Sequence, residues 1–155
     1  MVQLYRRKQS EVMIIAITLA ATIQAAPLRE APTSFAELGQ LRGWFGACAA
    51  YGWRLDEQQL HRWQASLILN DIIAMPRGED PIAVTEASTD QFKADLIRSF
   101  RASTASKVRL RSWADRIRTG CDGAAETFSS VLSRTEETDA TWNQFIETVE
   151  GRIQP

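Results

Sequence analysis

The sequence has few of the residues from which metal centres and catalytic sites are built. It contains one histidine, His61, and two cysteines, Cys48 and Cys121, in 155 residues. A single histidine excludes multi-histidine metal sites, and two cysteines so far apart do not form a zinc-binding set. There is no C-x-x-C motif to lower a thiol pKa and no glycine-rich phosphate loop. We therefore expect no cofactor and no metal.

The remaining candidates for catalysis are a lone base and some acidic pairs. His61 lies among polar residues with no serine or carboxylate partner specified, which favours an exposed histidine without a role. A small hydrolase could use two acids across a cleft, above all Glu79 with Asp80. These acids, like Glu136 and Glu137, fall in turns or at helix starts, where capping and the helix dipole favour them. A small hydrolase is therefore only the third of the functional interpretations, after the two binding roles described below.

Composition indicates one folded domain. Hydrophobic residues make up 45% of the chain and charged residues 24%, so disorder is not expected. The formal net charge is −1, but the first 25 residues carry +2, which leaves −3 on the rest. A mildly acidic domain is poorly suited to general nucleic-acid binding, and we expect no nucleic-acid partner.

The chain begins with the pattern of a signal peptide. Basic residues at 6–8 precede an uncharged apolar run at 12–23, and Ala25 and Ala26 supply the small residues that signal peptidase requires. The run is shorter than the roughly 20 apolar residues that span a bilayer. We predict a signal peptide (1–25), a linker (26–33) and a helical domain (34–155) in the periplasm or outside the cell. The alternatives are an uncleaved inner-membrane anchor facing the periplasm and a buried core helix.

Strand signals are absent from the pattern, because no run alternates with period two and few β-branched residues cluster. The expected fold is all-α, a four- to five-helix bundle. A capping box at Ser34 and Glu37 opens the first helix (34–52), and the second (56–75) ends at Met75-Pro76. Turn-forming residues predict a loop at 76–88.

The long third helix is expected at 89–120, with a kink near the weak helix formers Ser103, Thr104 and Ser106. Gly120 and Gly123 indicate a helix end followed by a restart. A short helix (124–133) and a last helix from residue 139 complete the prediction.

The two cysteines are predicted to form a disulfide. Cys48 shares a helix face with Leu41 and Phe45, and Cys121 is in phase with Leu96 and Ser103, so both sulfurs would point inward. Such a bridge would stabilise the domain by about 4 kcal/mol on the chain-entropy model. Two buried free thiols and a redox-active pair are the alternatives.

Five tryptophans are many for this length. Core filling is the ordinary explanation, since each ring buries a large apolar area. A ligand groove is the other explanation, and Trp44 is then the best candidate because it lies at the edge of its helix's apolar face.

Charge is segregated along the chain. Between 93 and 118, eight basic residues stand against two acidic ones, a net of +6; from 119 onward, seven acidic residues stand against two basic ones, a net of −5. On one helix (92–118) the bases would form two rows, with Arg98, Arg109 and Arg116 in one and Lys93, Lys107, Arg111 and Arg118 in the other.

Three interpretations of these rows are open. They could bind an acidic envelope protein, or lie on an anionic membrane surface, or simply pair with the acidic C-terminal helices. The preferred prediction is an exported binding or accessory protein, and the first alternative is a peripheral membrane-surface binder through helix 92–118.

Two fragments, LGQLRGWFGAC and RIRTGCDGAA, resemble a family of small exported two-cysteine helical proteins of Gram-negative bacteria. The chain departs from that family in its long 76–88 segment. The resemblance implies an exported helical protein with one bridge and brings no activity with it.

Overall fold

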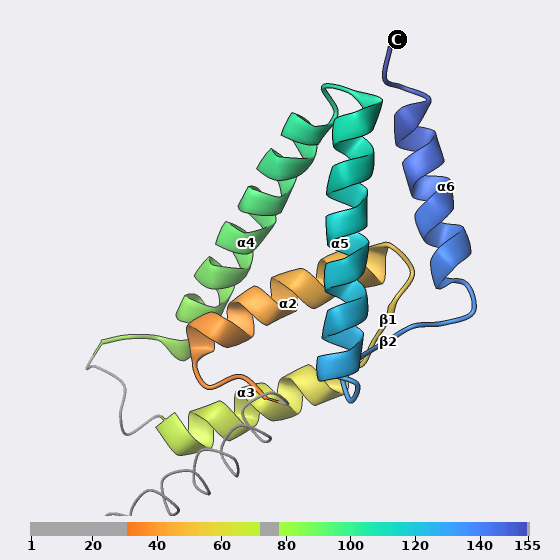
Figure 1. The fold of residues 1–155 in the computed structure, drawn as a ribbon. Coiled ribbons are helices and arrows are strands. Elements are labelled where there is room, and N and C mark those ends of the chain that lie inside the picture. The colour runs from red at the N-terminus through yellow and green to blue at the C-terminus, as the bar shows by residue number, and fades with distance from the viewer. Residues whose placement is uncertain (1–30, 72–77, 155) are drawn as a thin grey trace, which may run out of the picture. The chain divides into compact units, whose positions relative to one another are not determined.

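The computed structural model describes residues 31–71 and 78–154, and the described residues from Pro32 onward form one compact unit. The predicted signal peptide (1–25), residues 26–30 of the linker and Met75-Pro76 lie outside the described residues. The elements in chain order are α2 (Phe35–Ala50), β1 (Arg54–Leu55), α3 (Glu57–Asp71), α4 (Pro81–Ser103), α5 (Lys107–Thr127), β2 (Leu132–Ser133) and α6 (Thr138–Glu150) (Figure 1).

The predicted helical class is confirmed, with five helices in the described residues. The prediction of an all-α chain missed a small antiparallel ribbon, in which Arg54 pairs with Ser133 and Leu55 with Leu132. Each strand has two residues, too few for an alternating pattern to be visible in the sequence.

The first helix starts where the capping box predicts. The hydroxyl of Ser34 accepts a hydrogen bond from the Glu37 N–H at 3.1 Å. The Glu37 carboxylate accepts from the N–H and the hydroxyl of Thr33, both at 2.7 Å, instead of returning to Ser34. After Ala50 the chain turns at Gly52, whose φ of +110° is the left-handed region that glycine tolerates.

Helix α2 packs most extensively on α4, and its glycines allow the close approach. A Cβ on Gly39 would lie 2.3 Å from the Thr85 carbonyl oxygen, and one on Gly43 would lie 2.8 Å from the Phe92 ring. At this separation the Ser88 hydroxyl of α4 donates a 2.6 Å hydrogen bond to a backbone carbonyl of α2. The two backbones therefore touch with almost no side chain between them.

The predicted long helix at 89–120 is wrong. Pro81 occupies the first turn of α4 and the Asp80 carboxylate accepts from the Ile82 N–H at 2.9 Å, so the helix starts inside the predicted 76–88 loop. It ends at Ser103, and Ser106 then caps α5 by accepting from the Arg109 N–H at 3.2 Å. The expected kink is a reversal of direction, and α4 and α5 form an antiparallel hairpin (Figure 1).

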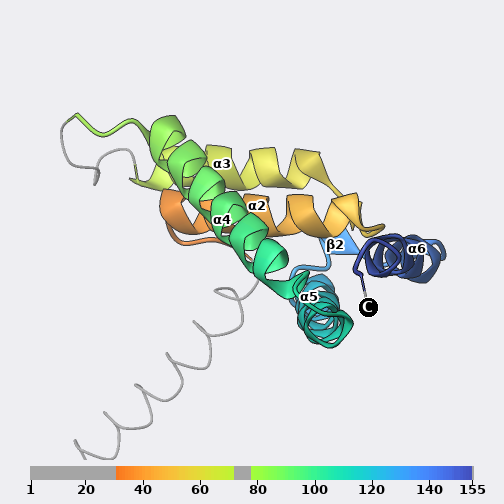
Figure 2. The same cartoon turned by 90° about the horizontal axis from the view of Figure 1, so that it is seen from above.

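The predicted break at Gly120 and the separate helix at 124–133 are also wrong, because α5 continues to Thr127. Gly120 lies inside α5 and makes room for the Trp44 ring, which a Cβ there would approach to 2.5 Å. The last helix, predicted to begin at residue 139, is α6, which begins one residue earlier at Thr138. It runs antiparallel to α5, and seen from above both are viewed nearly end-on beside α2 (Figure 2).

The predicted disulfide is present and links α2 to α5. Cys48 and Cys121 have Cα atoms 5.7 Å apart, and both residues are fully buried. Around them the core is aromatic: the Phe45 ring packs against Trp63 and Phe128 at centroid distances of 6.3 and 5.4 Å. The bond therefore lies within the core and not at its surface.

The α2–α4 crossing yields a stability prediction. Gly39→Ala should lower the free energy of unfolding by about 1–3 kcal/mol, because the new methyl group overlaps backbone atoms of α4. Gly46→Ala is the matched control, since a Cβ there meets nothing within 4 Å. It should stabilise α2 by about 0.5–1 kcal/mol through helix propensity. Urea unfolding of both variants measures the difference, and equal effects would contradict the close crossing.

Candidate functional site

The α4–α5 turn divides the predicted basic rows between two helices. Lys93 and Arg98 lie on α4, whereas Lys107, Arg109, Arg111, Arg116 and Arg118 lie on α5. Because the chain reverses between them, neither row runs along one cylinder as predicted. The basic residues instead face different neighbours.

Acidic residues neutralise one side of α5. The Arg111 guanidinium holds the Glu150 carboxylate of α6 through two contacts, Nε–Oε1 at 2.5 Å and Nη2–Oε2 at 3.3 Å. Arg118 binds Asp139 at 2.5 Å, and on α4 Arg98 pairs with Asp95 at 3.1 Å. Pairing of the rows with the acidic C-terminal helix is therefore confirmed for Arg111 and Arg118.

The other basic residues of the hairpin remain exposed. Among the described residues, none of them has a carboxylate within 4.0 Å. Arg109 and Arg116 are seven positions apart and share the side of α5 away from α6. Arg101 and Lys107 flank the turn at 104–106. We call these four the hairpin cations: Arg101, Lys107, Arg109 and Arg116.

Trp44 has a packing role. Its half-buried ring meets Phe92 edge to face at 5.6 Å between centroids and lies against Gly120 of α5. It thus fills the junction of α2, α4 and α5. The other four tryptophans are buried, which supports the core explanation.

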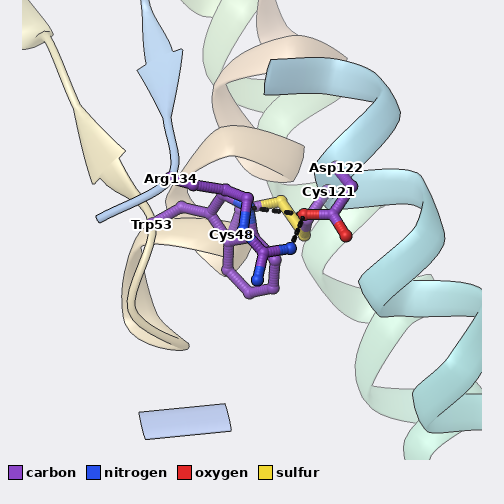
Figure 3. The surroundings of a disulfide bond; sticks show 5 residues. All are labelled: Cys48, Trp53, Cys121, Asp122 and Arg134. Carbon is purple, nitrogen blue, oxygen red and sulfur yellow. Dashed lines mark hydrogen bonds and ion pairs between the residues drawn. A yellow bond between two sulfur atoms is a disulfide. The ribbon is translucent and has the colours of Figure 1, made fainter. Parts of the chain in front are cut away.

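A charged cluster covers the disulfide on the ribbon side (Figure 3). Asp122, next to Cys121, accepts from the Trp53 indole N–H at 3.3 Å and from Arg134 at 2.7 Å. Arg134 also binds Asp139, and its guanidinium lies 6.0 Å from the Trp53 ring centroid. Desolvation opposes the charge of Arg134, but the two carboxylates outweigh it and raise its pKa.

The sequence did not indicate this cluster, because its members come from four separate segments. It fastens the ribbon and the start of α6 to α5. The charged groups of Asp122, Arg134 and Asp139 are paired with one another, which leaves none of them unpaired for a ligand. We therefore assign the cluster a structural role.

A polar groove of about 530 Å³ lies between α3 and α4 over Gly46 of α2. It is lined by charges of both signs, among them Arg42, Glu57, Asp90 and Lys93, and by His61. Within the described part of the chain His61 makes no side-chain hydrogen bond, and no cluster of His, Cys, Asp or Glu could hold a metal ion. Asp80, the candidate hydrolase acid, is occupied as the cap of α4.

No protein-family model matches the chain, and no significant match occurs among curated proteins or solved structures. None of the helices in the described ranges is long and apolar enough to cross a membrane. Function therefore has to be argued from this molecule's own surface.

The Arg111–Glu150 pair yields a pH prediction. The hydrogen bond from Arg111, helped by the charges of Arg111 and Lys107 and opposed by desolvation, lowers the pKa of Glu150. A carboxyl with a lowered folded-state pKa stabilises the fold at higher pH, and that stability is lost as the pH falls through the folded value. The melting temperature of the wild type should therefore fall more steeply below about pH 4.3 than that of Glu150→Gln.

Glu147→Gln is the control, because Glu147 lies on the same helix without an ion pair in the described structure. It should follow the wild-type pH profile. A Glu150→Gln profile that also coincides with the wild type would mean that the pair contributes nothing to folding.

Proposed function

We propose that this protein is exported to the cell envelope and acts there as a helical binding or accessory protein, which holds an anionic partner on the hairpin cations. The observation that carries the proposal is that some basic residues of the hairpin pair with carboxylates and others do not. Arg111 and Arg118, which face α6, have carboxylate partners at 2.5 Å. In the described structure Arg101, Arg109 and Arg116 have no carboxylate within 4.0 Å, and neither does Lys107, although the charge of Glu150 lies near it. Exposed unpaired charge of one sign speeds encounter with a partner of opposite charge.

Export is supported by two independent features. The N-terminal 25 residues have the charge and hydropathy pattern of a signal peptide. The buried Cys48–Cys121 bond is of the kind that persists in oxidising compartments and is rare in the bacterial cytoplasm. The resemblance of both cysteine segments to exported two-cysteine proteins agrees with this compartment.

The hydrolase alternative has less support. Asp80 accepts the Ile82 N–H at 2.9 Å as the cap of α4, so helix formation accounts for its presence. A catalytic acid pair would need a second carboxyl placed across a cleft from it. Binding therefore explains the surface with fewer assumptions.

The test is a pull-down from envelope extracts with the tagged mature protein. Arg109→Glu with Arg116→Glu reverses two hairpin cations, and recovery of the partner should fall by about tenfold. Raising the salt concentration should release the partner from the wild type, because exposed charges are screened.

The matched control is Arg54→Glu with Arg62→Glu. It makes the same charge change on exposed residues of β1 and α3, elements that carry none of the hairpin cations. Recovery should be close to the wild-type level. A partner lost equally with both pairs, or none retained by the wild type, would contradict a role for the hairpin cations.

A further inference from the structure

The turn between α4 and α5 lies at the same end of the helical unit as the C-terminus (Figure 1). Val108, the second residue of α5, is 78% exposed. Four large hydrophobic residues are at least half exposed in the described structure, and Ile97, 51% exposed, is another of them. Ile97 lies on α4 one helical turn before Arg101 and about 10 Å along the helix from the turn at 104–106.

The same end is strongly positive. Lys107 and Arg109 lie in the first turn of α5, which contains no acidic residue. The N-terminus of a helix carries the positive end of the helix dipole, so these cations add to it instead of being compensated. Glu136 and Glu137 lie between α5 and α6, at the opposite end of α5. Glu150 of α6 lies at the tip end and is bound by Arg111, so Arg101, Lys107 and Arg109 leave an excess of positive charge there.

A small groove adjoins this end. It has a volume of about 470 Å³ and lies between the turn, at Thr104 and Ala105, and the end of α6, at Val149. Phe100 and Ile153 give it apolar walls, and Arg152 adds a cation at its edge. Apolar surface and positive charge thus occur together on one end.

We propose that this end, which we call the hairpin tip (Arg101 to Arg109), docks on an anionic phospholipid bilayer. The inference rests on the proposed function, because it names the partner of the hairpin cations. Val108 enters the headgroup region, and Arg101, Lys107 and Arg109 bind lipid phosphates from around it.

The shape of the tip favours lipid over an acidic protein. Protein interfaces gain their energy from aromatic and arginine anchors that fill matching pockets. The hairpin tip has arginines but no aromatic side chain, and its apolar contribution is a single valine at the start of α5. A bilayer interface takes in an apolar side chain without a preformed pocket, and its surface potential draws in the cations.

The experiment is co-sedimentation of the mature protein with vesicles of phosphatidylglycerol and phosphatidylcholine, against vesicles of phosphatidylcholine alone. The wild type should bind the anionic vesicles and be released by salt. Val108→Asp should weaken binding by about tenfold through lost apolar contact and added repulsion. Replacing Lys107 and Arg109 by Gln should weaken it by about fivefold for each cation.

Leu69→Asp is the matched control. Leu69 is also 78% exposed but lies on α3, away from the tip, so the same kind of change should leave binding unaltered. Circular dichroism and melting curves establish that each variant is folded. Binding to neutral vesicles at the same level, or equal effects of Val108→Asp and Leu69→Asp, would overturn the membrane inference.

The two proposals fail separately. If anionic vesicles bind no protein but the pull-down from lipid-depleted extract still depends on Arg109 and Arg116, the partner is a protein and the membrane inference is overturned. If replacing the hairpin cations changes neither vesicle binding nor the pull-down, both the membrane inference and the proposed function are overturned.

Discussion

The covalent bond between Cys48 and Cys121 is the constraint on which the rest of the molecule depends. Helix α4 packs on α2 through a close crossing at Gly39 and Gly43, and α6 is bound to α5 through ion pairs. The bond joins these two parts in the core. Closing a loop with a sequence separation of 73 is worth about 4 kcal/mol on the chain-entropy model. Domains of this size are stable by about 5–15 kcal/mol in total, so this one link is a large share.

The charge distribution follows from that arrangement. With α5 fixed against α2, only one of its flanks faces α6, and Arg111 and Arg118 find carboxylates there. In the described structure Arg109 and Arg116 on the opposite flank, and Arg101 before the turn, have no carboxylate within 4.0 Å, whereas Lys107 lies near Glu150 without pairing with it. A sequence with a net charge of only −1 thus folds into a domain with a positive end. The proposed binding role depends on this local excess and not on the overall charge.

The spacing of apolar residues in the sequence correctly predicted which helix faces are buried. The predictions were wrong where they depended on the position of a helix end. Phe45, Cys48, Ser103 and Cys121 are buried, as the phase of their spacing indicates. The Asp80-Pro81 cap was hidden in a segment rich in turn residues. The weak helix formers near Ser106 indicated a kink, but not the full reversal after which Ser106 begins a new helix. Gly120 is a residue that often ends a helix, but here it lies within α5 and leaves room for the Trp44 ring. The Asp122–Arg134–Asp139 cluster is tertiary, so no spacing could reveal it.

The central claim is that the chain crosses into an oxidising compartment and that the Cys48–Cys121 bond forms there. The direct measurement is the intact mass of the product made by cells from the full sequence, denatured and treated with an alkylating reagent with and without prior reduction. We expect a chain that begins at Ala26 and gains alkyl groups on its two cysteines only after reduction. A product that retains Met1 and is alkylated on both cysteines without reductant would contradict the compartment and the bond together.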